Sequence, residues 1–591
     1  MRPSALDTIT QGLRAHPRFV AARAPMSNRF KMTLVHTTME ESIIQKRTSQ
    51  ASAIPVAWQL PTRPSVETGF NALDFIRNVP LLSSREQEIT ETTDAKALLE
   101  KLANGKLSSV EVTTAFCKRA ALAHQLTNCC TEIFFEEALD AARHADAHLA
   151  KTGKTLGPLH GLPVSMKDLF RIKGQDTTIG WVALAGKPAT EDGPTTQIVR
   201  KLGGILYVKT SIPQSMMMSD CYNHLFGQCV NSVNTKFISG GSSGGEASLI
   251  AAQGSVVGIG SDLGGSVRIP AALCGIYGLS PTTGRHPYEQ SGPRQNIVPS
   301  TAGPMTTSLS SIETYMEALS HIEPWQYDPG LSPVPWRPAL CATNKRLRIG
   351  YVVDDGVVKV QPPVARAVKK VISALHDAGH EVFEWDASSH GLCYNMWERG
   401  ILSDGGEGAR KTSQLSGEPL IEGMLIGTEK NLMNTSELHQ LQFEKAKYER
   451  AYLRQWTDSG VDALIMPVTP WVGYPPNTWV KSHQYVGYTS VWNFVNYAAL
   501  TMPVTTASRV HDQIDDEWRR HVPRNASDEF NHKQCEWTSN SLSRVFPTSL
   551  MKHQDNLESV EGLPVGIQVV GGKFGEERCV AVAKVIESLL K

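Results

Sequence analysis

Gly-Gly-Ser-Ser-Gly-Gly-Glu-Ala-Ser occupies residues 240–248, and Val-Val-Gly-Ile-Gly-Ser-Asp-Leu-Gly-Gly-Ser-Val-Arg-Ile-Pro occupies residues 256–270. Two glycine-flanked serines, Ser242 and Ser266, lie 24 residues apart in this stretch. Glycine permits backbone conformations with positive φ and the close approach of another group. Turns of this kind can expose a serine hydroxyl and aim backbone N–H groups at one point, which are the two features that acyl transfer needs.

The pattern around these serines predicts a helix, a strand and a turn. Residues 246–253 are typical of a short helix, and residues 256–262 of a buried strand, because they are apolar and β-branched. Residues 263–266 then form a tight turn, followed by a second short helix at residues 268–273. A serine between a strand and a helix can lie among the free N–H groups of a helix N-terminus, and Ser266 fits this description best.

Helices and strands alternate along the rest of the chain. Ser108 and Glu111 match a capping box, which predicts a helix to about His124. Lys167 lies in a short strand after a turn bounded by proline and glycine, and its apolar neighbours favour partial burial. The other predicted helices are 136–151, 195–202, 363–378 and 576–590, and the other predicted strands are 205–209, 347–353, 381–385 and 566–570.

This alternation predicts an α/β layered fold. No break in composition after residue 95 marks a linker, so we expect one large catalytic domain. Residues 510–561 are polar and are predicted to form a long, irregular surface excursion.

The composition excludes several classes of protein. The chain of 591 residues contains 58 basic and 58 acidic residues, and this balance argues against a nucleic-acid partner. Its 10 cysteines are scattered without a Cys-x-x-Cys pair, which indicates a reduced intracellular protein. No apolar run approaches the roughly 18 residues of a membrane helix. We therefore expect a soluble, cytoplasmic protein with no membrane partner.

Residues 1–38 differ from the rest, because they contain six arginines and lysines and a single acidic residue. An arginine-rich, acid-poor N-terminus is typical of a mitochondrial transit peptide. A disordered leader, or an upstream start codon used in place of Met32 or Met39, explains the same composition. The sequence leaves these alternatives open.

Three other interpretations of the chemistry are weaker. A phosphate-binding loop would need Lys-Ser/Thr after the glycines, or a third glycine closer to Gly258 and Gly260. Residues 240–244 match Gly-x-Ser-x-Gly, the nucleophile elbow, but residues 231–239 are polar where that motif requires a strand. Cys221 could act as the nucleophile of a Cys-Glu-Lys amide hydrolase, but its surroundings do not distinguish it from a buried core thiol.

The chain resembles the amidase signature family. The two serines of residues 240–266 carry the resemblance, together with His160-Gly161-Leu162-Pro163 before Lys167-Asp168 and the stretch at residues 562–568. The similarity covers roughly residues 45–591 and is closest to the fungal acetamidases, or general amidases. It implies a large, twisted, mixed β-sheet with helices on both faces, as one domain over residues 39–591 with a signature core at about 157–290.

The resemblance also implies the site residues. Ser266 would be the nucleophile, Ser242 a bridging serine preceded by a cis peptide bond, and Lys167 the base. Ser243 would support this geometry by hydrogen bonding. The oxyanion hole would consist of the backbone N–H groups of Leu263, Gly264, Gly265 and Ser266. No metal and no cofactor are required.

The implied reaction is hydrolysis of a carboxylic acid amide to the acid and ammonia through a serine acyl-enzyme. Small primary amides such as acetamide are the expected substrates. Hydrolysis of larger fatty or aryl amides, or of esters, is the alternative within the family. A catalytically silent amide-binding protein is the alternative from another class. The expected partner is thus a small-molecule amide, and a homodimer is left open.

Two departures from the family pattern lie close to Ser242. Ser239 replaces the proline that often precedes the first serine motif, and residues 231–234 replace an Asn-Pro pair. Both changes are expected to loosen the loop that holds Ser242. Residues 216–218 and the aromatic stretch 488–497 either line the acyl channel or belong to the core.

Overall fold

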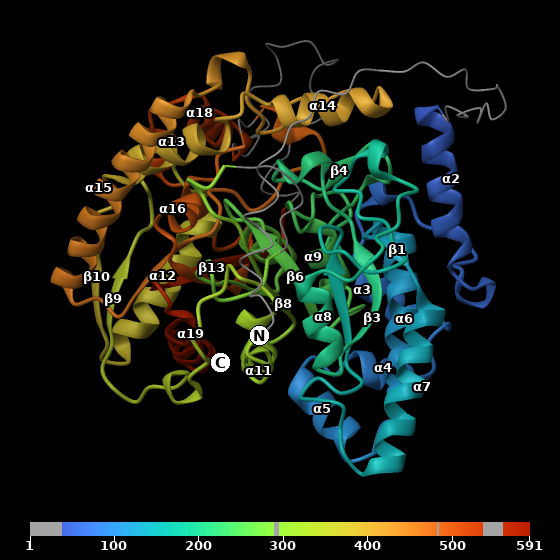
Figure 1. The fold of residues 1–591 in the computed structure, drawn as a ribbon. Helices are drawn as coiled ribbons and strands as arrows, with labels where there is room; N and C mark the ends of the chain where they lie inside the picture. The colour runs from blue at the N-terminus through green and yellow to red at the C-terminus, as the bar shows by residue number, and fades with distance from the viewer. Residues whose placement is uncertain (1–37, 289–294, 482–483, 536–559) are drawn as a thin grey trace, which may run out of the picture. The chain divides into compact units, whose positions relative to one another are not determined.

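An 11-stranded mixed β-sheet runs through the structure, which is a computed structural model and describes residues 38–288, 295–481, 484–535 and 560–591 (Figure 1). The strand order is β1-β3-β2-β6-β8-β7-β12-β13-β11-β9-β10. The strands are β1 (Cys130–Ile133), β2 (Pro163–Lys167), β3 (Ile205–Thr210), β6 (Val257–Asp262), β7 (Tyr277–Ser280), β8 (Thr301–Thr306), β9 (Arg348–Tyr351), β10 (Glu381–Glu384), β11 (Ala463–Pro467), β12 (Ala498–Thr506) and β13 (Pro564–Gly572). A separate two-stranded sheet consists of β4 (Tyr222–Asn223) and β5 (Gly227–Gln228).

Helices cover the sheet, and Figure 1 shows α6 and α7 on one flank and α13 and α15 on the other. These helices include α2 (Met39–Ser52), α6 (Ser109–Thr127), α7 (Phe135–Thr152), α9 (Gly244–Ala251), α11 (Leu309–Ser320), α12 (Pro362–Asp377), α13 (His390–Ile401), α14 (Glu407–Ser416), α15 (Thr435–Ser459), α16 (Gly487–Val495) and α19 (Glu576–Leu590). The remaining α-helices of the described residues are α3 (Ala72–Asn78), α4 (Ser84–Thr90), α5 (Ala95–Ala103), α8 (Pro194–Lys201), α10 (Arg268–Cys274), α17 (Asp516–Arg519) and α18 (Ala526–Gln534).

The predicted fold class is confirmed: a large mixed sheet with helices on both faces forms one domain. The parallel strands β2, β3 and β6 are buried along their whole length, as expected for strands covered on both faces. The helix α9 lies so close to β6 that a side chain at Gly258 would overlap the Glu246 carboxylate. Because β2 pairs in parallel with β6, Lys167 and Asp262, their last residues, lie at the same edge of the sheet.

Most of the elements predicted from the sequence are present. The capping box of Ser108 and Glu111 opens α6, which runs three residues beyond the predicted end. The strand predicted at 347–353 is shorter and covers residues 348–351. The prediction of an irregular segment at 510–561 is wrong in its described part, because α17 and α18 form there with aspartate and asparagine caps. The predicted N-terminal segment, apart from residue 38, lies outside the described residues.

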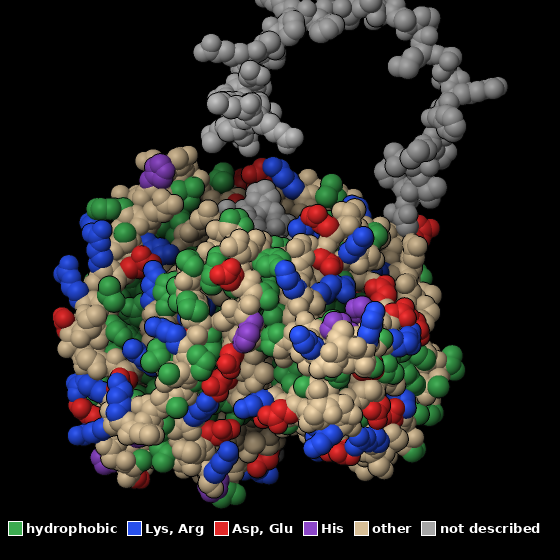
Figure 2. Space-filling view, turned by 60° about the horizontal axis from the view of Figure 1, so that its bottom comes forward, with side chains coloured by type: hydrophobic (Ala, Val, Ile, Leu, Met, Phe, Trp, Pro, Cys, Tyr) green, Lys and Arg blue, Asp and Glu red, His purple; other side chains and the backbone are tan. Residues whose placement is uncertain are grey.

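Membrane-spanning helices, cysteine pairing and surface charge can be examined in the described part of the chain. None of its helices combines the length and apolar character needed to cross a membrane. All ten cysteines are free thiols with buried side chains. On the face shown in Figure 2, basic and acidic side chains are interspersed.

Candidate active site

Lys167 ends β2 with its side chain fully buried. Its Nζ donates hydrogen bonds to Ser242 Oγ at 2.7 Å and to Ser261 Oγ at 2.9 Å. Burial lowers the pKa of Lys167 to about 7, because desolvation disfavours the ammonium form, although the charges of Asp262 and Glu246 oppose this shift. A lysine with this pKa is partly neutral near pH 7 and can accept a proton.

Ser242 and Ser243 lie in the turn that leads into α9. The peptide bond between Gly241 and Ser242 is cis, as the family resemblance implied. The Ser243 backbone N–H donates to the carbonyl of Ser266 at 3.1 Å. Its hydroxyl lies 3.3 Å from both the backbone N–H and the carbonyl oxygen of Ser261. Ser243 thus connects the Ser242 loop to the end of β6 and to the Ser266 turn.

Ser266 lies between β6 and α10 and is partly exposed, whereas Ser242 is only 2% exposed and Lys167 is fully buried. The Ser266 hydroxyl makes no hydrogen bond with any residue that the structure describes. The structure therefore joins Lys167 to Ser242 through their side chains, and joins Ser266 to the Ser242 loop through the backbone.

The backbone amides of the turn fall into two groups. The Gly265 N–H donates to Asp262 Oδ1 at 2.8 Å and is therefore already occupied. The other three amides have no protein acceptor within the described ranges; they belong to Leu263, Gly264 and Ser266.

A buried ion pair holds this turn. Arg268 donates from Nε to Asp262 Oδ2 at 3.1 Å and from its second guanidinium nitrogen to Oδ1 at 2.9 Å. Burial acts to raise the pKa of Asp262, but the neighbouring guanidinium outweighs it and holds that pKa below its usual value. Asn493, on α16, bonds to both partners of this ion pair. Its side-chain amide donates to Asp262 Oδ1 at 2.8 Å, and its Oδ1 accepts from Arg268 Nη2 at 2.7 Å. The sequence analysis did not identify any of these three residues.

We expect Arg268→Met to lower the free energy of unfolding by about 3–5 kcal/mol, because it leaves the Asp262 carboxylate buried and unpaired. Chemical denaturation followed by tryptophan fluorescence measures the change. The double variant Asp262→Asn with Arg268→Met removes both charges and should regain part of the loss. A single variant as stable as the parent would show that the pair does not hold the turn.

A second buried carboxyl group, also missed from the sequence, lies beneath the site. Glu246 accepts hydrogen bonds from the hydroxyls of Ser165 and Thr210, the latter at 2.7 Å. Burial raises the pKa of Glu246 to about 7, because desolvation disfavours the carboxylate and outweighs these bonds. Glu246 thus fastens α9 to β2 and β3 behind the Ser242 loop.

Side-chain hydrogen bonds hold the two positions that depart from the family pattern, Ser232 and Ser239, and the expected loosening stays a prediction. Both side chains are buried, and the Ser232 hydroxyl donates to the Ser248 carbonyl in α9 at 2.5 Å. Asn231 donates to the carbonyl of Leu273 in α10 at 2.8 Å. Polar side chains therefore anchor the loop in place of the missing prolines.

The aromatic stretch at 488–497 belongs largely to the core. Trp492 packs edge-on against His390 and Tyr452, with ring centroids 5.6 and 6.0 Å apart. The Tyr488 hydroxyl donates to the carbonyl of Val358 at 2.7 Å. Of the methionines at 216–218, only Met218 is buried, in a small cluster with Met424.

Two further features of the described residues, a cluster of potential metal ligands and a surface pocket, do not include Lys167, Ser242 or Ser266. His124, Cys129 and Cys130 each place one potential metal ligand within 4.8 Å of the others, but His124 Nδ1 already accepts the Cys130 N–H at 3.1 Å.

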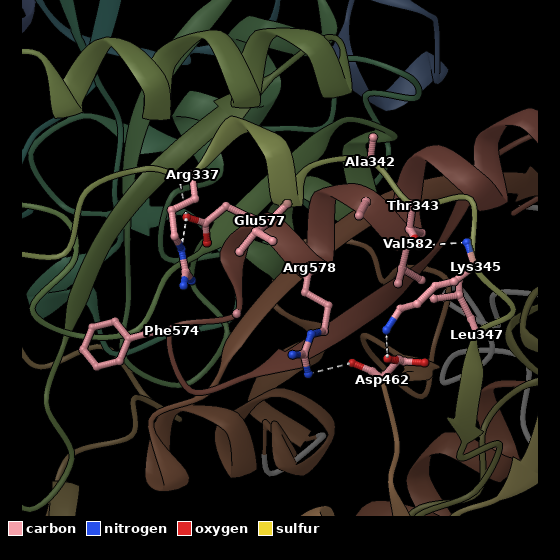
Figure 3. Close-up of a pocket in the computed structure, with 13 residues that line it drawn as sticks. Arg337, Ala342, Thr343, Lys345, Leu347, Asp462, Phe574, Glu577, Arg578 and Val582 are labelled. Atoms are coloured by element: carbon pink, nitrogen blue, oxygen red, sulfur yellow. Dashed lines mark hydrogen bonds and ion pairs between the residues drawn. The ribbon is translucent and has the colours of Figure 1, made fainter.

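Figure 3 shows a surface pocket of about 180 Å³ at the start of α19. Lys345 pairs with Asp462 at 3.1 Å and Arg337 with Glu577 at 3.5 Å, while Arg578 donates to the backbone carbonyl of Asp462.

Comparisons with known proteins identify the family of this chain. The family model named Amidase matches residues 111–580, so the chain belongs to the amidase family and is an enzyme that hydrolyses amide C–N bonds. It is 35% identical over 568 residues to an acetamidase of Emericella nidulans, covering 93% of this chain and 98% of that protein. It is 35% identical over 527 residues to Amidase 1 of Gibberella moniliformis, covering 87% and 95%.

Solved structures give the same result. A fatty acid amide hydrolase superposes with a TM-score of 0.84 at 30% identity, covering 94% of this chain and 97% of that chain. A bacterial aryl acylamidase of the amidase signature enzymes, 20% identical, shares the fold with a TM-score of 0.66 over 84% of this chain and 96% of that chain.

Proposed function

We propose that this enzyme hydrolyses small primary amides through a Ser-Ser-Lys triad, with Ser266 as nucleophile, Ser242 as bridging serine and Lys167 as base. The observation that carries the proposal is the 2.7 Å hydrogen bond between the buried Lys167 Nζ and Ser242 Oγ. A lysine with a pKa near 7 supplies the base that a serine nucleophile needs when no histidine is present.

The reaction begins when neutral Lys167 accepts the Ser242 proton while Ser242 accepts the Ser266 proton. The Ser266 oxygen attacks the amide carbonyl and forms a tetrahedral oxyanion. The proton returns through Ser242 to the leaving nitrogen, so that ammonia rather than an amide anion departs. Water then repeats the same proton path on the acyl-enzyme and releases the acid and Ser266.

In this proposal, the backbone amides of the turn stabilise the oxyanion, and Ser243 keeps the two loops in register. The free amides of Leu263, Gly264 and Ser266 are the donors available for this role. Gly265 contributes by fixing the turn on Asp262, because its own N–H is occupied. Each preorganised donor of this kind is worth roughly 3 kcal/mol of transition-state stabilisation.

The pH dependence follows from the state of Lys167. Only the neutral amine accepts a proton, and burial lowers its pKa to about 7. We therefore expect kcat/KM to rise with pH up to about 7 and to level off above it, falling about tenfold per pH unit on the acid side. Steady-state rates between pH 5 and 9 measure this profile, and a flat profile down to pH 5 would contradict a lysine base.

Relatives named acetamidase, at 35% and 34% identity, support small aliphatic amides as substrates. The similarity to a fatty acid amide hydrolase favours larger acyl groups as the second candidate. Ammonia release from acetamide, longer aliphatic amides and benzamide tests both. The highest kcat/KM for acetamide would support the proposal, whereas activity that rises with chain length would support the alternative. A cytoplasmic location and a homodimer remain predictions.

A further inference from the structure

Two side chains from distant helices hold the carbonyl groups of the turn that carries Ser266. The Trp397 indole N–H, on α13, donates to the Leu263 carbonyl at 3.0 Å. The Thr489 hydroxyl, on α16, donates to the Gly264 carbonyl at 2.5 Å. Each contact spans a long stretch of sequence, 134 and 225 residues respectively.

Holding these carbonyls determines where the next amides point. In a planar trans peptide, the C=O of one residue and the N–H of the next point in opposite directions. Trp397 therefore directs the free Gly264 N–H away from itself. Thr489 likewise directs the Gly265 N–H away from itself and toward Asp262. The peptide between Gly264 and Gly265 is therefore held at its carbonyl by Thr489 and at its N–H by Asp262.

The two side chains also limit how far the turn can move. A Cβ at Gly264 would lie 2.5 Å from Cζ2 of the Trp397 ring, and one at Gly265 would overlap the Thr489 hydroxyl. The Gly265 φ of +128° is in addition one that residues with a Cβ rarely adopt. The turn is therefore packed directly against both helices.

Thr489 is itself fixed by the ion pair beneath the turn. Arg268 donates to the Thr489 carbonyl at 3.0 Å and to Asp262, which accepts the Gly265 N–H. Asn493, one helical turn beyond Thr489 on the same face of α16, binds the same carboxylate. Asp262, Arg268 and Thr489 therefore form a closed ring of hydrogen bonds with the turn.

We propose that Trp397 and Thr489 are positioning residues for the oxyanion-binding turn at 263–266: Trp397 aims the free Gly264 amide, and Thr489 fixes the next peptide, so that the free amides on either side keep their direction. They act through Leu263 and Gly264 without touching the substrate themselves. The inference rests on the proposed function, because it assigns the role of these residues to the transition state of that reaction.

The test uses substitutions that remove the hydrogen-bond donor. Thr489→Val keeps the side-chain volume, whereas Trp397→Phe also shortens the ring, a loss that its matched control shares. Trp397→Phe and Thr489→Val should each lower kcat roughly tenfold and change KM by less than about twofold, because an oxyanion contact forms only in the transition state. Thr489→Ser keeps the hydroxyl and should restore most of the rate. The matched controls are Trp385→Phe and Thr127→Val, which remove an indole bond to Tyr452 and a hydroxyl bond to Ala123 and should leave kcat unchanged.

A second measurement distinguishes a change in the orientation of the oxyanion-binding amides from a general loss of order in the active site. The aldehyde analogue of the best amide forms a tetrahedral adduct with a serine nucleophile and therefore reports on oxyanion binding. Its inhibition constant should rise in Trp397→Phe and Thr489→Val by the same factor by which kcat/KM falls. Inhibition by the carboxylic acid product and the acid-side pKa should stay as in the parent, because Lys167 is untouched.

Three outcomes would overturn the inference: unchanged kcat in both variants, a raised KM at constant kcat, or an aldehyde affinity that does not follow kcat/KM. The activity of each positioning variant is compared with that of Ser266→Ala. If that variant is inactive while the two positioning variants are fully active, only this inference fails. If Ser266→Ala keeps its activity, the proposed function itself fails. Should one positioning variant not fold, the other still decides.

Discussion

Replacing Ser266 by alanine is expected to abolish amide hydrolysis while the protein stays folded. Ser266 is partly exposed and its hydroxyl makes no hydrogen bond with a described residue, so the substitution removes no hydrogen bond from the described structure. Without it, no acyl-enzyme can form, and turnover should fall by on the order of 10⁴-fold or more. Ammonia release at saturating acetamide measures the change, and near-ultraviolet circular dichroism checks the fold.

The matched control for Ser266→Ala is Ser310→Ala, another partly exposed serine, located on α11. It should leave the rate unchanged. A covalent serine reagent should label the parent and Ser310→Ala, but not Ser266→Ala. Undiminished ammonia release from Ser266→Ala would remove Ser266 from the mechanism.

Replacing Lys167 by methionine should lower kcat by roughly 10²–10⁴-fold, the usual contribution of a general base. Methionine keeps most of the volume of this fully buried side chain but cannot accept a proton. The remaining activity should lose the pH dependence near 7, because the group responsible for it is absent. Rates measured across the same pH range test both statements.

Lys167→Arg makes the test sharper. A guanidinium stays protonated at any accessible pH, so this variant keeps the positive charge but not the base and should be as inactive as Lys167→Met. Lys173→Met, at an exposed position, is the control. Substantial activity in Lys167→Arg would show that the site needs a charge there rather than a base.

The candidate site residues were predicted from short sequence motifs and from the family that these motifs resemble. The serines of residues 240–266 and the lysine among apolar neighbours are short-range patterns, and the structure joins Lys167 to Ser242 as expected. The capping box at Ser108 is local in the same sense. Such features depend on neighbours within a few residues, which a single sequence displays.

The support of the site could not be predicted in this way. Trp397 and Thr489 reach the turn only because the fold brings α13 and α16 beside it, and nothing near them in sequence indicates that contact. The sequence analysis singled out the aromatic residues of α16, whereas its polar residue Thr489 bonds to the turn and Asn493 bonds to the ion pair of Asp262 and Arg268. The buried ion pair was also missed, since Asp262 and Arg268 lie within the motif but show their pairing only when folded.

The position of β13 in the sheet has a consequence for synthesis on the ribosome. This strand, made of residues 564–572, lies between β12 and β11 and pairs with both. Until it emerges, the nascent chain presents two unpaired strand edges in the interior of the sheet, and such edges promote aggregation. The sheet can therefore be completed only after β13 has been translated, and until then chaperones have two open edges to protect.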